Sequence, residues 1–108
     1  MALPHAQPGQ AVDLRPLGSQ LAATRTHALF KSKDLEVMRL VLLAGQTLPV
    51  HQVPGEITVH CLEGCLELTT DGRIRRLQAG ELLFLAGGMP HGVRAQADTT
   101  ALVTIALR

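Results

Sequence analysis

Short apolar runs separated by turn residues fill the chain from residue 26 to its C-terminus. Such runs, repeated about every 8 to 12 residues, are typical of a β-sandwich or a β-barrel. They predict nine strands, at 26–31, 35–43, 48–53, 57–62, 65–70, 73–77, 81–85, 91–95 and 100–107. Because almost no helical pattern remains, we predict an all-β fold, namely an antiparallel jelly-roll barrel, or double-stranded β-helix.

Two glycine-containing pairs indicate tight turns between these strands. Glu63-Gly64 and Asp71-Gly72 each separate two apolar runs by two residues. Glycine readily takes the positive φ that such short turns need. We therefore predict a β-hairpin at each pair.

The N-terminal part of the chain has a different pattern. Prolines and glycines interrupt residues 1–24, and only 19–23 could form a helical turn or two. We predict an irregular arm over residues 1–24, with a short helix, and a barrel domain over 25–108.

Two of the predicted strands are apolar on both faces. In 65–70 apolar and polar residues alternate, which indicates one buried face and one wet face. In 35–43 and 100–107 both parities are largely apolar, so both faces need a cover. The N-terminal arm or a second copy of the chain could supply it, and we favour a homodimer.

Composition excludes several classes of partner. A formal net charge of +1 and only two aromatic residues, Phe30 and Phe84, argue against nucleic-acid binding. No apolar run reaches the roughly 18 residues needed to span a membrane, and the N-terminus lacks a secretory pattern. We therefore expect a cytoplasmic protein in which Cys61 and Cys65 are small apolar residues rather than a disulfide or a metal-binding pair.

Two histidines follow similar glycine turns in separate parts of the chain. Gly45 precedes a short strand that ends at His51, and Gly80 begins a strand and a second turn that lead through Gly88 to His91. The repeated arrangement suggests that the two imidazoles enter one pocket.

These motifs resemble those of the cupin family, the small RmlC-like jelly-roll barrels that usually hold one divalent metal near the barrel mouth. The matching positions are Gly45, His51 and Gly64 in the first motif and Gly80, Gly88 and His91 in the second. The resemblance covers roughly residues 25–107. Two family ligands are replaced here, because Val53 stands where the second histidine falls and Ile57 where the glutamate falls.

The resemblance implies a divalent metal, Fe, Mn, Ni or Zn, bound by His51 and His91. Metal sites normally have at least three protein ligands, so a third donor is needed. His60 is the natural candidate by position, although strand alternation puts it on the face opposite Ile57. Glu56 is the alternative third donor.

A pocket between the two histidines would be mainly apolar. The residues that we expect to line it are Val53, Ile57, Val59, Phe84, Met89 and, as a polar member, Gln52. The triplet of arginines at 73, 75 and 76 is interpreted as a solvated strand edge.

Two functions remain open. The first is a metal-dependent cupin acting on a small organic ligand, such as a dioxygenase or an isomerase, with the reaction unspecified. The alternative is a metal-free module that binds or senses a small molecule in a degenerate cupin site. A purely structural dimerisation domain would leave the paired histidines unexplained.

Overall fold

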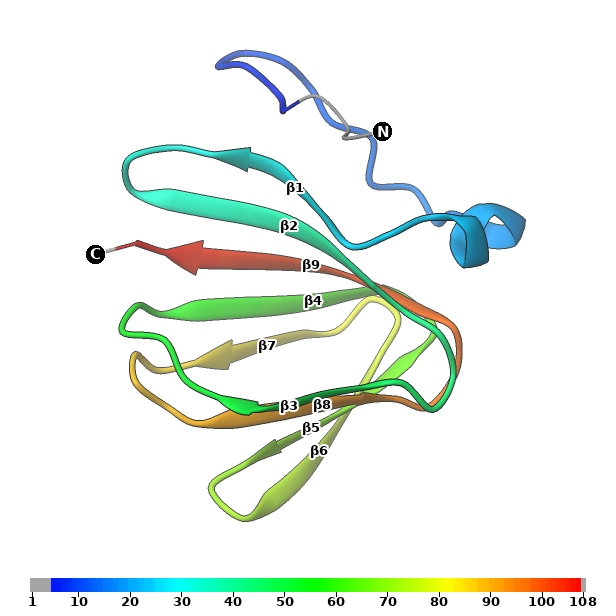
Figure 1. The fold of residues 1–108 in the computed structure, drawn as a ribbon, viewed down its shortest axis with the longest axis vertical. Coiled ribbons are helices and arrows are strands. Elements are labelled where there is room, and N and C mark those ends of the chain that lie inside the picture. Colours follow the sequence, from blue (N-terminus) through cyan, green and yellow to red (C-terminus); the bar gives the residue numbers. More distant parts are fainter. Residues whose placement is uncertain (1–4, 108) are drawn as a thin grey trace.

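The computed structural model describes residues 5–107, which form two β-sheets and one short 3-10 helix (Figure 1). The elements are η1 (Gly18–Ala23), β1 (His27–Lys31), β2 (Leu35–Leu42), β3 (Thr47–His51), β4 (Ile57–Glu63), β5 (Cys65–Thr70), β6 (Arg73–Gln78), β7 (Leu82–Leu85), β8 (His91–Ala95) and β9 (Thr99–Ala106). One sheet has the order β1-β2-β9-β4-β7 and the other β3-β8-β5-β6. Every strand pairing among these residues is antiparallel, which confirms the predicted all-β jelly roll.

Each predicted apolar run corresponds to one strand, with ends that agree within two residues. One of the two predicted hairpins is also present, since β5 and β6 pair across Asp71 and Gly72, which have φ values of 52° and 69°. The turns therefore lie where the sequence places residues that accept positive φ.

The other predicted hairpin was wrong. Gly64 separates β4 from β5, but these strands belong to different sheets, so the turn carries the chain across the barrel. A Cβ at Gly64 would lie 2.3 Å from the Asp98 carbonyl oxygen and 2.4 Å from the Thr99 hydroxyl oxygen. This crossing brings the chain against the start of β9, and only glycine fits there with a φ of 84°.

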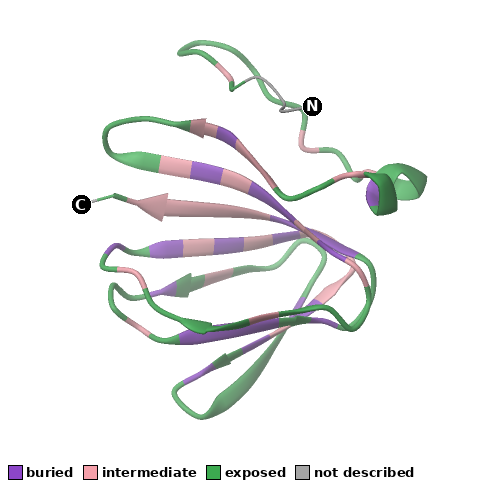
Figure 2. Cartoon of the chain, viewed as in Figure 1, coloured by how far each residue is buried: buried purple, intermediate pink, exposed green. Residues whose placement is uncertain are grey.

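The core lies between the inner faces of the two sheets and is packed most tightly at one end. Along β4, from Ile57 to Cys61, buried residues alternate with partly buried ones (Figure 2). Cys61, Leu66 and Ala101 are completely buried at the tightly packed end. Towards the other end Val103 and Ile105 of β9 are only partly buried, and this end holds a cavity.

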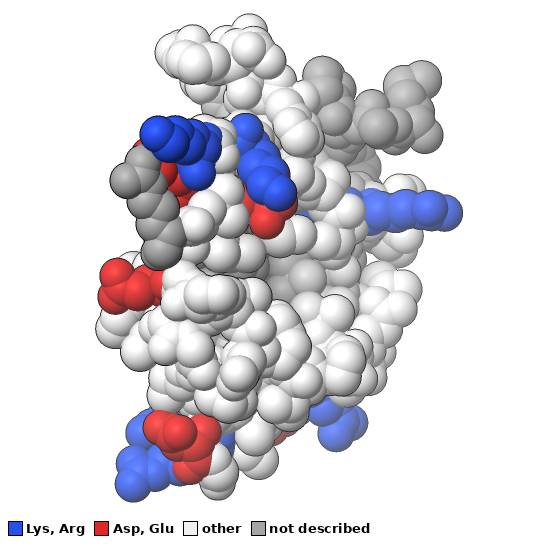
Figure 3. Space-filling view, turned by 60° about the vertical axis from the view of Figure 1, so that its left-hand side comes forward, with Lys and Arg blue, Asp and Glu red and all other residues white. Residues whose placement is uncertain are grey.

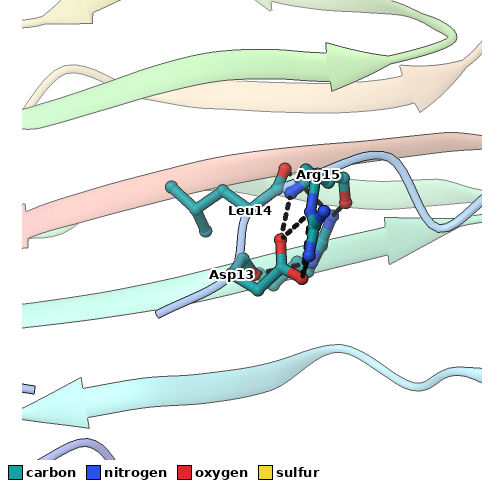
Figure 4. Close-up of polar contacts among 4 residues, drawn as sticks. Asp13, Leu14 and Arg15 are labelled. Atoms are coloured by element: carbon teal, nitrogen blue, oxygen red, sulfur yellow. Dashed lines mark hydrogen bonds and ion pairs between the residues drawn. The ribbon is translucent and has the colours of Figure 1, made fainter. Parts of the chain in front are cut away.

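The N-terminal arm is attached to the outer face of the five-stranded sheet by two charged side chains. The guanidinium of Arg39 on β2 donates hydrogen bonds to the backbone carbonyl oxygens of residues 13, 14 and 15 (Figure 4). The carboxylate of Glu63 accepts hydrogen bonds from the N–H groups of Leu17 and Gly18 and from the Thr100 hydroxyl. The buried Arg39 and the half-buried Glu63 thus provide hydrogen-bond partners for backbone groups of the arm that do not pair with any strand.

On one face of the molecule, charged side chains of both signs are spread out and form no single patch. In the view of Figure 3, basic and acidic side chains lie mainly towards the two ends, and much of the surface between them is uncharged. Within residues 5–107, no helix is long and apolar enough to cross a membrane.

The attachment of the arm through Glu63 should depend on pH. Burial alone would raise the pKa of this carboxyl, but hydrogen bonds from Leu17, Thr100 and Gly18 outweigh it and hold the pKa below its ordinary value. A lowered pKa stabilises the fold above the unfolded value of about 4.3, and this stability is lost as pH falls through the folded value.

We therefore expect Glu63→Gln to lower the free energy of unfolding by about 1–2 kcal/mol at pH 7 and by less at about pH 3. Urea unfolding monitored by circular dichroism measures both values. Glu36→Gln is the matched control, because the Glu36 side chain makes no hydrogen bond within residues 5–107. A penalty for Glu63→Gln that is the same at both pH values would contradict this account.

Candidate functional site

His51 and His91 lie side by side at the open end of the barrel. They are directly opposite each other on the paired strands β3 and β8. Their ring centroids are 4.4 Å apart and the ring planes are inclined by 57°. Two imidazoles that are 40 residues apart in sequence therefore face the same space.

Glycines allow the two loops beside these histidines to approach each other. The N–H of Gly88 donates to the Val53 carbonyl oxygen over 2.8 Å, which ties the loop before β8 to the loop after β3. A Cβ at Gly87 would lie 2.4 Å from the Pro54 carbonyl oxygen. This close contact holds the ends of β3 and β8 in the register that pairs the histidines.

Each imidazole is oriented by a backbone carbonyl two residues earlier. Nδ1 of His51 is 3.2 Å from the Pro49 carbonyl oxygen, and Nδ1 of His91 is 3.0 Å from that of Met89. A carbonyl oxygen can only accept, so Nδ1 carries the hydrogen in both rings. In the neutral rings both Nε2 atoms are therefore left with a free lone pair.

The histidines border a cavity of about 420 Å³ between the sheets, which we call the central cavity. His91 is buried, with 5% of its surface exposed, whereas His51 is exposed at the rim. The remaining lining residues are Thr26, Met38, Leu40, Leu48, Pro49, Val53, Ile57, Val59, Val93, Val103 and Ile105. Apart from Thr26 and the two histidines, the wall is apolar.

The donor set fits a divalent metal only in part. Two imidazoles with free Nε2 atoms resemble metal-binding histidines, whose other ring nitrogen is usually hydrogen-bonded. Within residues 5–107, no three His, Cys, Asp or Glu side chains lie close enough together to hold an ion. The chain itself thus offers two ligands where three or more are usual.

His60 is separated from the pair, so its expected role as a third ligand was wrong. On β4, Ile57, Val59 and Cys61 are buried in the core, and His60 alternates with them on the outer face. There it lies opposite Leu82 of β7 and Leu102 of β9. No bulge occurs between Ile57 and His60, because the register with β7 and β9 is continuous there.

Other predicted lining residues divide between two places. Val53, Ile57 and Val59 line the central cavity. Phe84 and Met89 do not, and instead border a separate depression beside β6. Phe84 was misplaced because it follows the parity of the outer face of β7, where it is 60% exposed.

Gln52 and Glu56 also lie outside the central cavity. Both are exposed in the loop between β3 and β4. Gln52 directly follows His51 at the end of β3, so alternation directs it away from the inner face.

The sequence interpretation missed the cavity walls contributed by β2, β3, β8 and β9. Alternation in 91–95 could have identified Val93, which shares its face with buried Ala95. The segments 35–43 and 100–107 are apolar on both faces, so alternation does not distinguish Leu40 and Ile105. No sequence signal marks Thr26, which reaches the cavity because its hydroxyl bonds both backbone groups of Val41.

The ring orientations can be tested directly in solution. We expect both histidines to carry the hydrogen on Nδ1 when neutral, because each donates to a carbonyl oxygen. Long-range ¹H–¹⁵N NMR correlations, recorded well above the ordinary histidine pKa of about 6.5, distinguish the two tautomers. Nε2–H in both rings would contradict the geometry, and His60 serves as an internal comparison.

Comparison with known proteins places these features in a family. A model described as Cupin domain matches residues 38–107. No curated protein matches the chain significantly.

Solved structures with the same fold come from several bacteria. A conserved protein of unknown function from Streptococcus pyogenes is 22% identical, with a TM-score of 0.77 over 98% of this chain and 94% of that one. An RmlC-like cupin from Desulfovibrio desulfuricans is 30% identical, with a TM-score of 0.70 over 96% of both chains. The DMSP lyase DddQ from Ruegeria pomeroyi is 29% identical, with a TM-score of 0.69 over 75% of this chain and 45% of that one. Because the cupin-domain match also covers more than half of the sequence, this chain belongs to the cupin family.

Proposed function

We propose that this cupin binds a small, mainly apolar organic molecule in the central cavity, with His51 and His91 as anchors for its polar end. The observation that carries the proposal is an aliphatic cavity of about 420 Å³ whose polar wall groups are two adjacent imidazoles and Thr26. Ligand pockets are typically a few hundred Å³ in volume, mostly apolar and fitted with few polar groups.

The hydrogen bonds of the histidines define the polar group of the ligand. Both Nδ1–H groups are engaged by carbonyl oxygens, so each neutral ring offers only Nε2 as an acceptor. A hydroxyl or a protonated acid on the ligand would donate to one of them. An apolar molecule that carries such a donor is the best match for this cavity.

A divalent metal is the second candidate, and the two free Nε2 atoms favour it. His51 and His91 would hold the ion, and the remaining ligands would come from water or from the organic molecule. When bound, such an ion would act as a Lewis acid on an oxygen of the ligand. Two protein ligands support weak binding only, so we rank this candidate below the metal-free one.

The two candidates are tested with p-cresol, its hydroxyl-free analogue toluene and Zn²⁺, each titrated into metal-depleted protein and followed by NMR. We expect p-cresol to shift the amide signals of Val59, Val93 and Val103. His51→Leu combined with His91→Leu should weaken p-cresol binding several-fold, because one hydrogen bond is lost, and should leave toluene binding unchanged.

His60→Leu is the matched control, because this histidine lies on the outer face of β4. If p-cresol shifts no cavity signal, the proposal is wrong. The metal-dependent function would become the preferred one if Zn²⁺ binds tightly, if the double histidine substitution abolishes Zn²⁺ binding, and if p-cresol binds only when Zn²⁺ is present.

We also retain the homodimer and the cytoplasmic location as proposals. The outer face of the five-stranded sheet supports the dimer, because Leu82 of β7 is 64% exposed opposite His60, which is also opposite Leu102 of β9. An uncovered leucine beside other apolar groups is typical of an interface between chains. Light scattering should show a dimer for the native protein and a monomer for Leu82→Lys. A native protein that is monomeric would refute the dimer proposal.

A further inference from the structure

The barrel has a second opening, where its two sheets end in strands that do not pair with each other. These strands are β6 and β7. Between them lies a depression of about 460 Å³, which we call the lateral cleft. Its lining residues are Thr70, Asp71, Arg73, Arg75, Leu83, Phe84, Leu85 and Met89. It is distinct from the central cavity, with which it shares no lining residue.

Two of the three arginines on β6 are exposed but share the parity of the inner face and line the lateral cleft. Leu77 is buried in the core, and Arg75 and Arg73 precede it by two and four residues, so all three share one face of the strand. Opposite Arg75 and Arg73 on β5 are the buried residues Leu68 and Thr70. All three arginines are exposed, which agrees with the predicted solvated edge, and their parity places Arg73 and Arg75 beside the lateral cleft.

The third arginine provides an internal contrast. Arg76 lies on the outer face of β6, directly opposite Glu67, which is also opposite Arg94 on β8. An acidic residue thus neighbours the outward arginine. The inward arginines have a leucine and a threonine as their cross-strand neighbours instead.

Both inward guanidinium groups are free to bind a ligand. Within residues 5–107, neither Arg73 nor Arg75 makes a side-chain hydrogen bond or an ion pair. The acidic member of the cleft lining is Asp71, which occupies the exposed tip of the β5–β6 hairpin. Residues two apart on a strand are about 6.7 Å apart, so both arginines can contact one anionic group.

The opposite side of the lateral cleft is apolar. Leu83 and Leu85 follow the inward parity of β7, and Leu85 is only 1% exposed. Met89 packs against the core from the loop before β8. Two unpaired cations therefore face an aliphatic wall across one depression, an arrangement that matches an anion with an apolar body.

We propose that the lateral cleft is a binding site for a small amphiphilic carboxylate. Arg73 and Arg75 would bind the carboxylate through the fork geometry that guanidinium groups offer to such anions. The aliphatic body would lie against Leu83, Leu85 and Met89. This site goes beyond the proposed function, because it uses neither histidine and involves a different ligand charge.

The cleft is nevertheless next to the histidine pair. Thr70 donates its hydroxyl hydrogen to the Pro90 carbonyl oxygen over 3.2 Å and is directly opposite His91. Successive cross-strand pairs thus form one row across the four-stranded sheet, from His51 through His91 and Thr70 to Arg73. A ligand in the lateral cleft should therefore also shift the amide signal of His91.

Octanoate, 1-octanol and inorganic phosphate are suitable probes, titrated separately and followed by NMR. We expect octanoate to shift the amide signals of residues 70–75 and 83–85 and to bind more tightly than either other probe. Replacing both arginines, Arg73→Gln with Arg75→Gln, should weaken octanoate binding at least about tenfold, because charge-assisted hydrogen bonds are lost. The affinity should also fall with added salt.

Arg76→Gln with Arg94→Gln is the matched control, since it removes two positive charges on either side of Glu67 on the outer face and should change octanoate affinity less than twofold. The proposal is overturned if octanoate shifts no cleft signal, or if this control pair weakens octanoate binding as much as Arg73→Gln with Arg75→Gln does. Equal binding of 1-octanol would refute the role of the charge, and equal binding of phosphate would refute the role of the apolar wall. A failure of p-cresol to bind in the central cavity would not affect the octanoate test, because the two tests follow the amide signals of different residues.

Discussion

The two sheets pack face to face tightly at one end of the barrel only, and the rest of the structure depends on this uneven packing. Completely buried residues such as Cys61, Leu66 and Ala101 close that end. Their burial provides the hydrophobic stabilisation that holds the sheets together. The opposite end therefore does not need to be tightly packed for the fold to be stable. The central cavity and the histidine pair lie at that end.

Main-chain atoms, rather than other side chains, orient the groups that could bind ligands. Carbonyl oxygens of Pro49 and Met89 fix the two imidazoles, and these carbonyls belong to the same strand ends that the loops between β3 and β4 and before β8 hold together. The ring positions are therefore a property of strand register. The histidine pair is thus positioned without help from Val53 and Ile57, the two positions at which the resemblance to cupins implies further ligands.

Membership of the cupin family describes a scaffold and leaves the chemistry to individual side chains. In this chain the scaffold presents two openings with opposite chemical character. The central cavity is aliphatic with neutral hydrogen-bond acceptors, whereas the lateral cleft combines cations with an aliphatic wall. The central cavity lies between the inner faces of the sheets, whereas the lateral cleft lies between the edge strands β6 and β7.

The sequence by itself determined the strands, most of the turns and the pairing of two distant histidines. These features are local or repeat at fixed spacing, so apolar runs and glycines such as Gly72 and Gly88 report them directly. Only the tertiary structure decided that the Gly64 turn crosses between sheets and that Arg73 and Arg75 border a cleft beside β7. Each of these depends on which strands become neighbours, and that choice is made by packing across the barrel rather than by residues close in sequence.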